Sequence, residues 1–394
     1  MELKATPLEK LAPRLEGIKP ITRAERQERV KKVSRLMQKE GMTALFLDAG
    51  SSLYYFTGVS WSQSERTTGA VITAEGDVAY ICPAFEKQRL EEMLPQEHSI
   101  YTWEEHENPF LLIPMLLRQY GITEGNLGIN SRARFFIVDG IRKASDAFTP
   151  VNADSVVVPC RLYKSEAEIA LMQRANDITA EAFKTCISML KEGMSQSEFH
   201  LLSVEAHRAM GVQGGIDIQF GPSSAFPHGS REVTRLSTGD VVLMDGGCRV
   251  EGYTSDISRT IIFGRPTARQ REIWELEKKA QAAGFSAAEP RSTCEAVDTA
   301  ARSVLEEHGF GPGYRLPGLP HRTGHGIGLD GHEWGDIVQG NRMQLETGMC
   351  FSIEPTISIY GEFGMRLEDC VYMTREGARF FTQPSPDIEV PFAD

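Results

Sequence analysis

Residues 241–264 read VVLMDGGCRVEGYTSDISRTIIFG, and residues 349–374 read MCFSIEPTISIYGEFGMRLEDCVYMT. In both stretches, runs of apolar and β-branched residues flank a segment that contains glycines, which is typical of two β-strands joined by a turn. Each stretch carries one acidic residue where the first strand ends and another on the returning strand: Asp245 and Asp256 in the first, Glu354 and Glu368 in the second. The sequence therefore predicts two hairpins with carboxylates at corresponding places.

A pair of predicted helices precedes each hairpin. Apolar residues recur at helical spacing after Ser165, after Ser195, after Thr267 and over residues 297–305. The first three helices open with a capping box, because a Glu or Gln follows the capping hydroxyl three positions later. Three of the four helices are expected to end at a glycine: Gly193, Gly211 and Gly309. The order helix–helix–hairpin thus occurs twice, and we expect residues 161–394 to form one pseudo-symmetric α+β domain around a central sheet.

The N-terminal half alternates helices with strands and is predicted to be a separate α/β domain over residues 1–160. Helices are expected at 24–40 and 109–120, and strands at 43–50, at 125–131 and on both sides of the turn Glu75-Gly76-Asp77 within 69–83. The apolar run at 155–161 is expected to be a last strand that leads into the long helix after Ser165.

Composition and charge exclude several classes of protein. The 394 residues include 42 Lys and Arg against 54 Asp and Glu, a net charge of −12, which argues against a nucleic-acid partner. No apolar run is long enough for a membrane span, and the charged N-terminal residues do not resemble a secretory signal. Seven cysteines without a CxxC pair are typical of reduced thiols. We therefore expect a cytoplasmic protein.

The four hairpin carboxylates interrupt strands that otherwise look buried. Burying a carboxylate costs several kcal/mol unless the group is paired or bound to a metal. Arg259 and Arg366 are the available arginines, and two are too few to compensate four charges. One or two divalent metal ions would balance these carboxylates.

Between the hairpins, residues 321–333 read HRTGHGIGLDGHE and hold three of the nine histidines: His321, His325 and His332. The intervening glycines let the backbone approach a ligand closely. A site with several carboxylates and one imidazole suits Mn²⁺, Co²⁺, Fe²⁺ or Zn²⁺.

Each of these features also has a structural interpretation. An acid at a strand end is usually a turn or cap residue, His228 and His332 are compatible with ordinary loop histidines, and Arg366 with an ion-pair partner. The joint order of two acids, a glycine-flanked histidine and two acids on matching elements favours a metal site.

On these motifs, residues 160–380 resemble the M24 metallopeptidases, whose catalytic domain is called the pita-bread fold. Within that family the chain is most similar to the Xaa-Pro peptidases, prolidase and aminopeptidase P. The N-terminal half resembles the creatinase/prolidase N-terminal domain. The resemblance thus implies a creatinase/prolidase-type α/β domain at 1–160 and a pita-bread catalytic domain at 161–394.

The resemblance also implies a dinuclear metal site. Asp245 would bind the first ion, His325 and Glu354 the second, and Asp256 and Glu368 would bridge both. Glu354 would accept the proton of the attacking water. His228 and His332 are also expected to be catalytic, and the residues expected to contact the substrate are His228, His321, His332, Arg366 and Trp61. Trp61 lies in a loop. In the family that the chain resembles, the N-terminal domain closes over the active site of a neighbouring subunit, so Trp61 either contributes to that closure or anchors a dimer interface. Trp334 either narrows the pocket or packs against its loop.

The function implied is an Xaa-Pro dipeptidase with two divalent ions, Mn²⁺ in the first place and Co²⁺, Zn²⁺ or Fe²⁺ as alternatives. A small Xaa-Pro peptide is the expected partner, in a homodimer without nucleic acid or membrane. The alternatives are an aminopeptidase P acting on longer Xaa-Pro peptides, a non-peptidase M24 enzyme similar to ectoine hydrolase or dimethylsulfoniopropionate lyase, and a metal-free binding module.

Overall fold

The computed structural model describes residues 5–94 and 98–393, and the chain divides into two compact units. One unit is Ile21–Arg161, and the other combines the segment up to Pro20 with the chain from Leu162 onward. Residues 5–20 are therefore not part of the unit Ile21–Arg161, which differs from the expected range of 1–160. Arg14 shows why: its N–H donates to the carbonyl oxygen of Met210 at 3.0 Å, and its side chain pairs with Glu181 at 3.3 Å.

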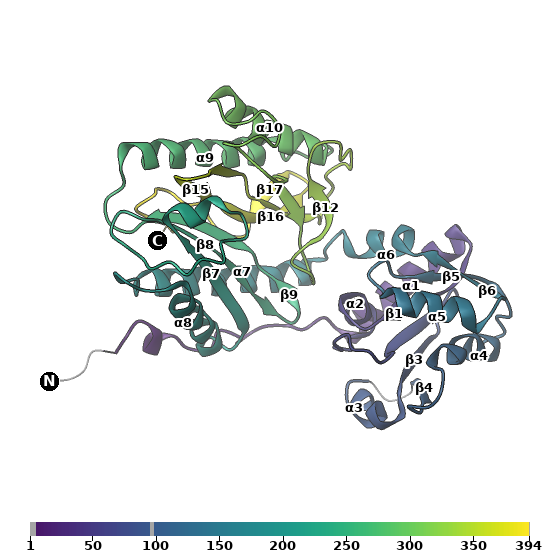
Figure 1. Cartoon of the computed structure of the whole chain (residues 1–394). Helices are drawn as coiled ribbons and strands as arrows, with labels where there is room; N and C mark the ends of the chain where they lie inside the picture. The colour runs from purple at the N-terminus through teal and green to yellow at the C-terminus, as the bar shows by residue number, and fades with distance from the viewer. Residues whose placement is uncertain (1–4, 95–97, 394) are drawn as a thin grey trace. The chain divides into compact units, whose positions relative to one another are not determined.

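The unit Ile21–Arg161 is a mixed six-stranded sheet with helices, as the sequence predicted (Figure 1). The strand order is β4-β3-β2-β1-β5-β6, in which β2 runs antiparallel to both of its neighbours and the other pairs are parallel. The strands are β1 Met42–Asp48, β2 Gly69–Thr73, β3 Val78–Pro83, β4 Ser99–Trp103, β5 Gly125–Ile129 and β6 Phe148–Asn152. The helices are α1 Arg23–Glu40, α2 Ser51–Thr57, α3 Lys87–Glu91, α4 Leu112–Gln119, α5 Phe135–Ala144 and α6 Asp154–Arg161, with 3-10 turns at Ala84–Glu86 and Pro109–Leu111.

One predicted strand is wrong, because residues 155–161 belong to helix α6. The side-chain oxygen of Asn152 accepts the N–H of Asp154 at 2.9 Å and so turns the chain into the helix. Val156, Val157 and Cys160 are buried, and α6 packs against α1. Tertiary packing therefore overrides the β-preference of the three consecutive valines.

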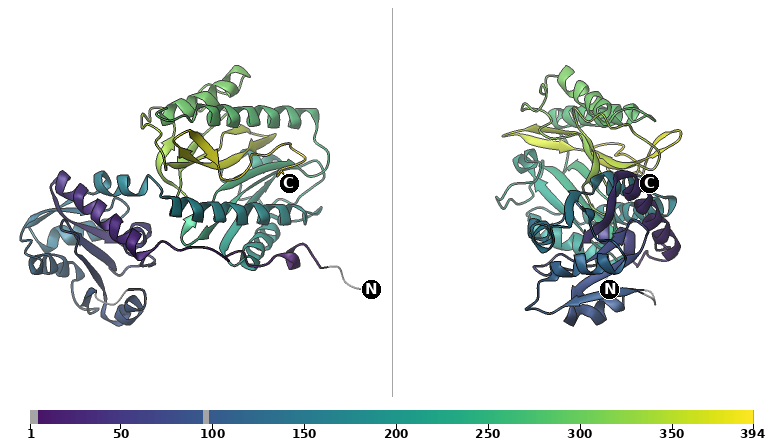
Figure 2. Two further views of the ribbon diagram at one scale, coloured as in Figure 1. Left: turned by 180° about the vertical axis from the view of Figure 1, so that it is seen from behind. Right: turned by 90° about the vertical axis from the view of Figure 1, so that its right-hand side faces the viewer.

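The second unit has the predicted helices in the predicted order. They are α7 Glu166–Ile187, α8 Gln196–Ala209, α9 Ala268–Ala287 and α10 Cys294–Glu307, with short 3-10 turns at Leu8–Lys10 and Gly221–Ala225. Capping boxes at Ser165, Ser195 and Thr267 open the first three helices as expected. Helix α7 ends at Ile187, before the predicted stop at Gly193. Figure 1 and Figure 2 show the strands lying between the pair α7 and α8 and the pair α9 and α10.

The central sheet of this unit has nine strands. The main path is β12-β11-β13-β16-β10-β8-β7, with β17 paired to β16 and β9 paired to β8. The bounds are β7 Gln213–Phe220, β8 Val241–Val250, β9 Tyr253–Thr254, β10 Ile257–Ile262, β11 Gly324–Gly326, β12 Glu333–Ile337, β13 Cys350–Ile353, β16 Glu368–Thr374 and β17 Gly377–Phe380. The two sequence halves meet where β10 pairs antiparallel with β16. We call this pairing the seam.

The second hairpin is more elaborate than the sequence predicted. Between β13 and β16 the chain forms a separate two-stranded sheet, β14 Thr356–Ile359 with β15 Phe363–Arg366. A hydrophobic core that includes Trp274 of α9 packs against this small sheet and the main one, with Ile357 and Met365 fully buried. Throughout residues 5–94 and 98–393, none of the helices combines the length and apolar character that crossing a membrane requires.

Candidate metal centre

The acidic side chains meet at the seam because of strand register. Ser258 on β10 lies opposite Asp245 on β8 and opposite Glu368 on β16. Three neighbouring strands therefore place these residues in one row across the sheet. Asp256 lies directly before β10, and a carboxylate oxygen of Asp256 lies within 4.8 Å of ligand atoms of Asp245 and Glu368. The structure thus brings three of the four predicted carboxylates together at the seam.

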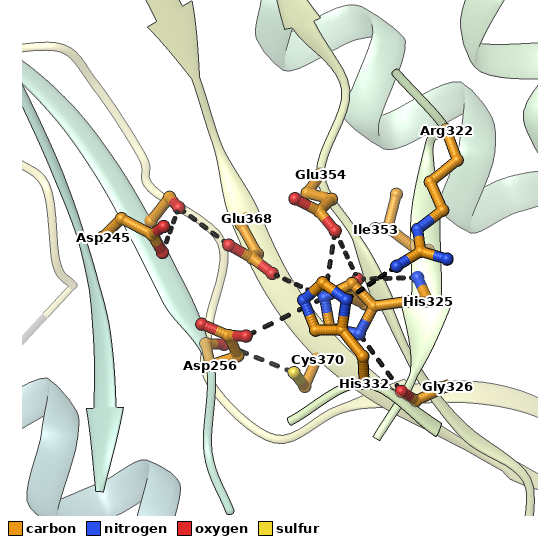
Figure 3. Close-up of polar contacts among 12 residues, drawn as sticks. Asp245, Asp256, Arg322, His325, Gly326, His332, Ile353, Glu354, Glu368 and Cys370 are labelled. Atoms are coloured by element: carbon orange, nitrogen blue, oxygen red, sulfur yellow. Dashed lines mark hydrogen bonds and ion pairs between the residues drawn. The ribbon is translucent and has the colours of Figure 1, made fainter. Parts of the chain in front are cut away.

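Glu354 and His325, which come from later in the chain, lie beside these carboxylates (Figure 3). His325 Nε2 lies 3.1 Å from Glu354 Oε1, 3.8 Å from Asp256 Oδ2 and 3.9 Å from Glu368 Oε1. Two sets of three residues, His325 with Glu354 and Glu368, and Asp245 with Asp256 and Glu368, each offer ligand atoms within 4.8 Å of one another. All five predicted ligands therefore converge, and Glu368 is common to both sets.

The two carboxylate oxygens of Glu368 face different neighbours. Oε2 accepts a hydrogen bond from the Ser258 hydroxyl at 2.7 Å, on the side of Asp245. Oε1 is the atom nearest His325, and it is buried without a hydrogen-bond partner among the residues that the structure describes. A buried carboxylate oxygen without a donor calls for a cation.

The backbone around His325 requires glycine on both sides. A Cβ at Gly324 would lie 1.9 Å from the carbonyl oxygen of Ser352, and one at Gly326 would lie 1.8 Å from that of Trp334. The ring N–H at Nδ1 of His325 donates to the Gly326 carbonyl at 3.1 Å. This bond leaves the Nε2 lone pair directed at the carboxylates, which is the orientation of a histidine that binds a metal.

The electrostatics also favour a cation. Burial, and then the charge of Asp245, raises the pKa of Asp256 to about 8. Burial, and then the charge of Asp256, raises the pKa of Glu368 well above its usual range. Without further positive charge these groups would therefore hold protons at neutral pH. Four carboxylates and one imidazole match the ligand set of divalent ions such as Mn²⁺, Fe²⁺, Co²⁺ and Zn²⁺, so the residues fit the implied metals.

Glu354 behaves differently from the other carboxylates. Burial alone would raise its pKa, but the hydrogen bond and charge of His325 outweigh burial and lower the pKa to about 2. For His325, in turn, the bond to Glu354 outweighs burial and raises the pKa. The second partner of Glu354 is the Ser352 hydroxyl, which donates a hydrogen bond to Glu354 Oε1 at 3.0 Å. Glu354 is therefore ionised at neutral pH.

Ser258 is a site residue that the sequence analysis missed. It is fully buried, and its hydroxyl lies 2.9 Å from Asp245 Oδ1 and 2.7 Å from Glu368 Oε2. Arg366 Nε donates to the same hydroxyl at 2.9 Å. The available signal was its position two residues after Asp256, on the same face of a strand.

Arg366 is buried beside the carboxylates. Its Nη2 lies 2.6 Å from Asp245 Oδ2, and its Nη1 donates to the carbonyl oxygen of Pro227 at 3.2 Å. The structure therefore shows the ion pair that the sequence left open as an alternative. Arg259, the other candidate for compensating the acids, pairs instead with Asp369 at 2.7 Å, both side chains being fully buried.

The other predicted site residues lie at varying distances from the five ligands. The His332 ring stacks on that of His325, with 3.8 Å between centroids. His321 uses both ring nitrogens, since Nδ1 contacts the Arg322 carbonyl oxygen at 2.7 Å and Nε2 contacts the Thr356 hydroxyl at 3.0 Å. Burial lowers the pKa of His321 and that of His332.

The remaining predicted substrate residues are His228 and Trp61. His228 is exposed, and none of its described contacts reaches the five ligands. Trp61 is half-buried in the unit Ile21–Arg161, where the Arg89 guanidinium lies 4.6 Å from its ring centroid. Their predicted roles remain predictions. Arg322 and Thr356, which contact the predicted histidines, were missed because neither residue type marks a metal site.

Comparison with known proteins identifies the family of each half of the chain. Residues 170–375 match the model of metallopeptidase family M24, and residues 29–163 match the creatinase/prolidase N-terminal domain. The chain is 30% identical to the Xaa-Pro dipeptidase of Lactobacillus helveticus over 91% of this chain and 98% of that protein.

Solved structures agree with this assignment. A dipeptidase from Pyrococcus horikoshii OT3 superimposes with a TM-score of 0.82 at 30% identity, covering 90% of this chain and 98% of that one. The dipeptidase PepE from Mycobacterium ulcerans gives a TM-score of 0.86 at 28% identity, over 95% of this chain and 100% of that one. With a matching fold and five converging residues that could hold metal ions, the chain belongs to metallopeptidase family M24.

Proposed function

We propose that this protein is an Xaa-Pro dipeptidase, a prolidase, that uses two divalent metal ions. The observation that carries the proposal is the convergence of five ligands in two sets of three that share Glu368. A relative named as an Xaa-Pro dipeptidase, aligned over nearly its whole length, supports the substrate class. We expect Mn²⁺ in the cell, with Co²⁺, Zn²⁺ and Fe²⁺ as alternatives, because the ligand set has one imidazole and no thiolate.

The proposed ligand roles follow the two sets. Asp245 holds one ion, His325 and Glu354 hold the other, and Asp256 and Glu368 are shared. The opposite orientation of the two Glu368 oxygens supports its shared role. When bound, such ions polarise a carbonyl group and lower the pKa of a water molecule.

Glu354 is the proposed proton acceptor for the attacking water. Its lowered pKa keeps it ionised, and the hydrogen bond that the Ser352 hydroxyl donates to it holds the carboxylate in one orientation. The proton then passes to the imino nitrogen of the departing proline. Because this nitrogen carries no hydrogen in the peptide, a pocket shaped for the ring, and not a backbone hydrogen bond, provides specificity for proline.

His228 and His332 are the remaining proposed catalytic and substrate residues. A dipeptide presents a carboxylate, which needs a cation or N–H donors. Arg366 already pairs with Asp245 and the Pro227 carbonyl oxygen, so we assign the carboxylate first to His228, the residue after Pro227. His332 and His321 then line the side of the pocket next to His325.

Incubation of the Mn²⁺-loaded protein with Ala-Pro and with Ala-Pro-Ala tests the function. A dipeptidase cleaves Ala-Pro, whereas cleavage of the longer peptide alone would identify an aminopeptidase P. Cleavage of neither by a metal-loaded protein would indicate a non-peptidase M24 enzyme, and failure to retain divalent ions would indicate a binding module.

Our proposal includes a cytoplasmic homodimer in which Trp61 lies near the active site of the neighbouring subunit. The half-buried ring beneath Arg89 is suited to an interface, because an aromatic side chain offers a large apolar surface. Sedimentation of the wild type and of Trp61→Ala tests this. A monomeric wild type would refute the proposal, and an Ala variant that stays dimeric with lower activity would favour substrate contact over anchoring.

A further inference from the structure

Arg322 contacts two histidines of the site, one through a hydrogen-bond acceptor and the other through a donor. Its carbonyl oxygen is 2.7 Å from Nδ1 of His321. Its guanidinium Nη2 is 2.7 Å from Nδ1 of His332. Figure 3 shows the guanidinium reaching the stacked rings of His325 and His332. One residue therefore touches the same ring atom of two different histidines.

These contacts determine where each ring carries its proton. A carbonyl oxygen only accepts, so Nδ1 of His321 donates, and its Nε2 then accepts from the Thr356 hydroxyl. A guanidinium only donates and stays charged in proteins, so Nδ1 of His332 must accept. In the neutral ring of His332 the proton is consequently on Nε2. The two histidines have opposite tautomers.

Asp336 holds the guanidinium in place. Arg322 Nη1 donates to Asp336 Oδ1 at 2.6 Å, and Asp336 is on strand β12, which starts directly after His332. The Arg322 side chain is 30% exposed and the Asp336 side chain 43%, so the pair lies at the rim of the site. The fork of the guanidinium spans both partners at once, which a single ammonium group does less well.

We propose that Arg322 is a positioning residue that fixes His332 as a hydrogen-bond donor at Nε2. His332 then offers an N–H to a substrate oxygen and does not take a proton at that atom. The inference rests on the proposed peptidase function, in which His332 contacts the substrate. A ring nitrogen of His332 lies within 4.8 Å of ligand atoms of both Asp256 and His325, which places the ring at the reacting centre.

Steady-state kinetics of Arg322→Met, Arg322→Lys and His332→Ala on Ala-Pro test the proposal. Removing one preorganised donor from a transition state costs about 10²–10³-fold in kcat, so a donor that is only misplaced should cost about ten- to a hundredfold. We expect this loss in Arg322→Met with KM little changed and metal content equal to wild type. Arg322→Lys keeps a cationic donor and should recover part of kcat.

The double variant separates an effect through His332 from a direct one. If Arg322 acts through His332, then Arg322→Met should change kcat less than about twofold in a His332→Ala background. An equal loss in both backgrounds would overturn the proposal. Arg342→Met is the matched control, because Arg342 is 86% exposed and pairs at 3.7 Å with Glu295, away from the five ligands. It should keep wild-type kcat.

Nitrogen NMR of the ring gives a readout that does not depend on activity. In protein labelled with ¹⁵N-histidine and loaded with diamagnetic Zn²⁺, the His332 signals are identified by their loss in His332→Gln. We expect the proton on Nε2 in the wild type and a mixture of tautomers in Arg322→Met. A wild-type proton on Nδ1 would refute the inference. If the wild type cleaves no Xaa-Pro peptide, the proposed function fails, but this measurement still tests the tautomer.

Discussion

Replacing Ser258 by alanine should weaken metal binding without changing any ligand. The buried hydroxyl lies within 2.9 Å of Asp245 Oδ1, Glu368 Oε2 and Arg366 Nε. It has one proton, so it donates to one carboxylate and accepts from the guanidinium. Loss of such a residue behind metal ligands costs about 10–100-fold in metal affinity. Because each factor of ten is about 1.4 kcal/mol, the change in binding free energy should be about 1.4–2.8 kcal/mol.

Competition between the protein and a chelating dye for Mn²⁺ measures this change directly. Ser358→Ala is the matched control: Ser358 is also fully buried in a strand of the same unit, but its hydroxyl has no hydrogen-bond partner within the described parts of the chain. Its alanine variant should bind Mn²⁺ like the wild type. Equal Mn²⁺ affinity in Ser258→Ala and Ser358→Ala would show that Ser258 does not orient the ligands.

Further perturbations separate the roles of the buried charges. Glu368→Ala should abolish both metal retention and Ala-Pro hydrolysis, since it removes the residue common to both ligand sets; elemental analysis that still finds two ions per chain would contradict this. Burial raises the pKa of Asp256 to about 8, so the folded metal-free protein keeps a proton that the unfolded chain loses, and its stability should fall as pH rises from about 4 to 8. Mn²⁺ binding should displace this proton, and calorimetry in two buffers at pH 6 should detect its release. In denaturant titrations, Arg259→Met should lower the free energy of unfolding by about 3–5 kcal/mol, because it leaves the buried carboxylate of Asp369 without its ion-pair partner. The control Arg379→Met removes an exposed ion pair and should lower it by less than about 1 kcal/mol.

The acidic residues that converge in the structure could be picked out from the sequence because their pattern is local. An acid at the end of an apolar strand is visible in the one-dimensional pattern, and the repeat of that pattern marks equivalent places. Ser258 shows the limit of the approach. A serine in a strand is common, and its value comes from register, which places it opposite Asp245 on one side and Glu368 on the other. The register between two strands that are distant in sequence cannot be predicted from the sequence of either strand alone.

The errors in the fold have a similar origin. Three consecutive valines favour a strand, but packing of α6 against α1 makes them helical. The division of the sequence at residue 160 grouped residues 5–20 with the N-terminal unit, whereas the contact of Arg14 with Met210 joins them to a segment that is distant in sequence. Capping boxes, by contrast, were located correctly, since both partners of each lie within one turn of helix.

The two ligand sets depend to different degrees on the seam, the pairing of β10 with β16. His325, Glu354 and Glu368 all come from the second half of the unit, so this set depends on the pairing of β11, β13 and β16 with one another. Asp245 and Asp256 come from the first half and meet Glu368 across the pairing of β10 with β16, which involves two residue pairs and is accompanied by the contact of Cys370 Sγ with the Asp256 carbonyl oxygen at 3.3 Å. Ser258 is one of the residues in that pairing and bonds across it. Of the two proposed ions, the one assigned to Asp245 should therefore be the first to leave when the seam is disturbed. It would take both Asp245 and Asp256 from across the seam, whereas the other ion would take only the shared Asp256.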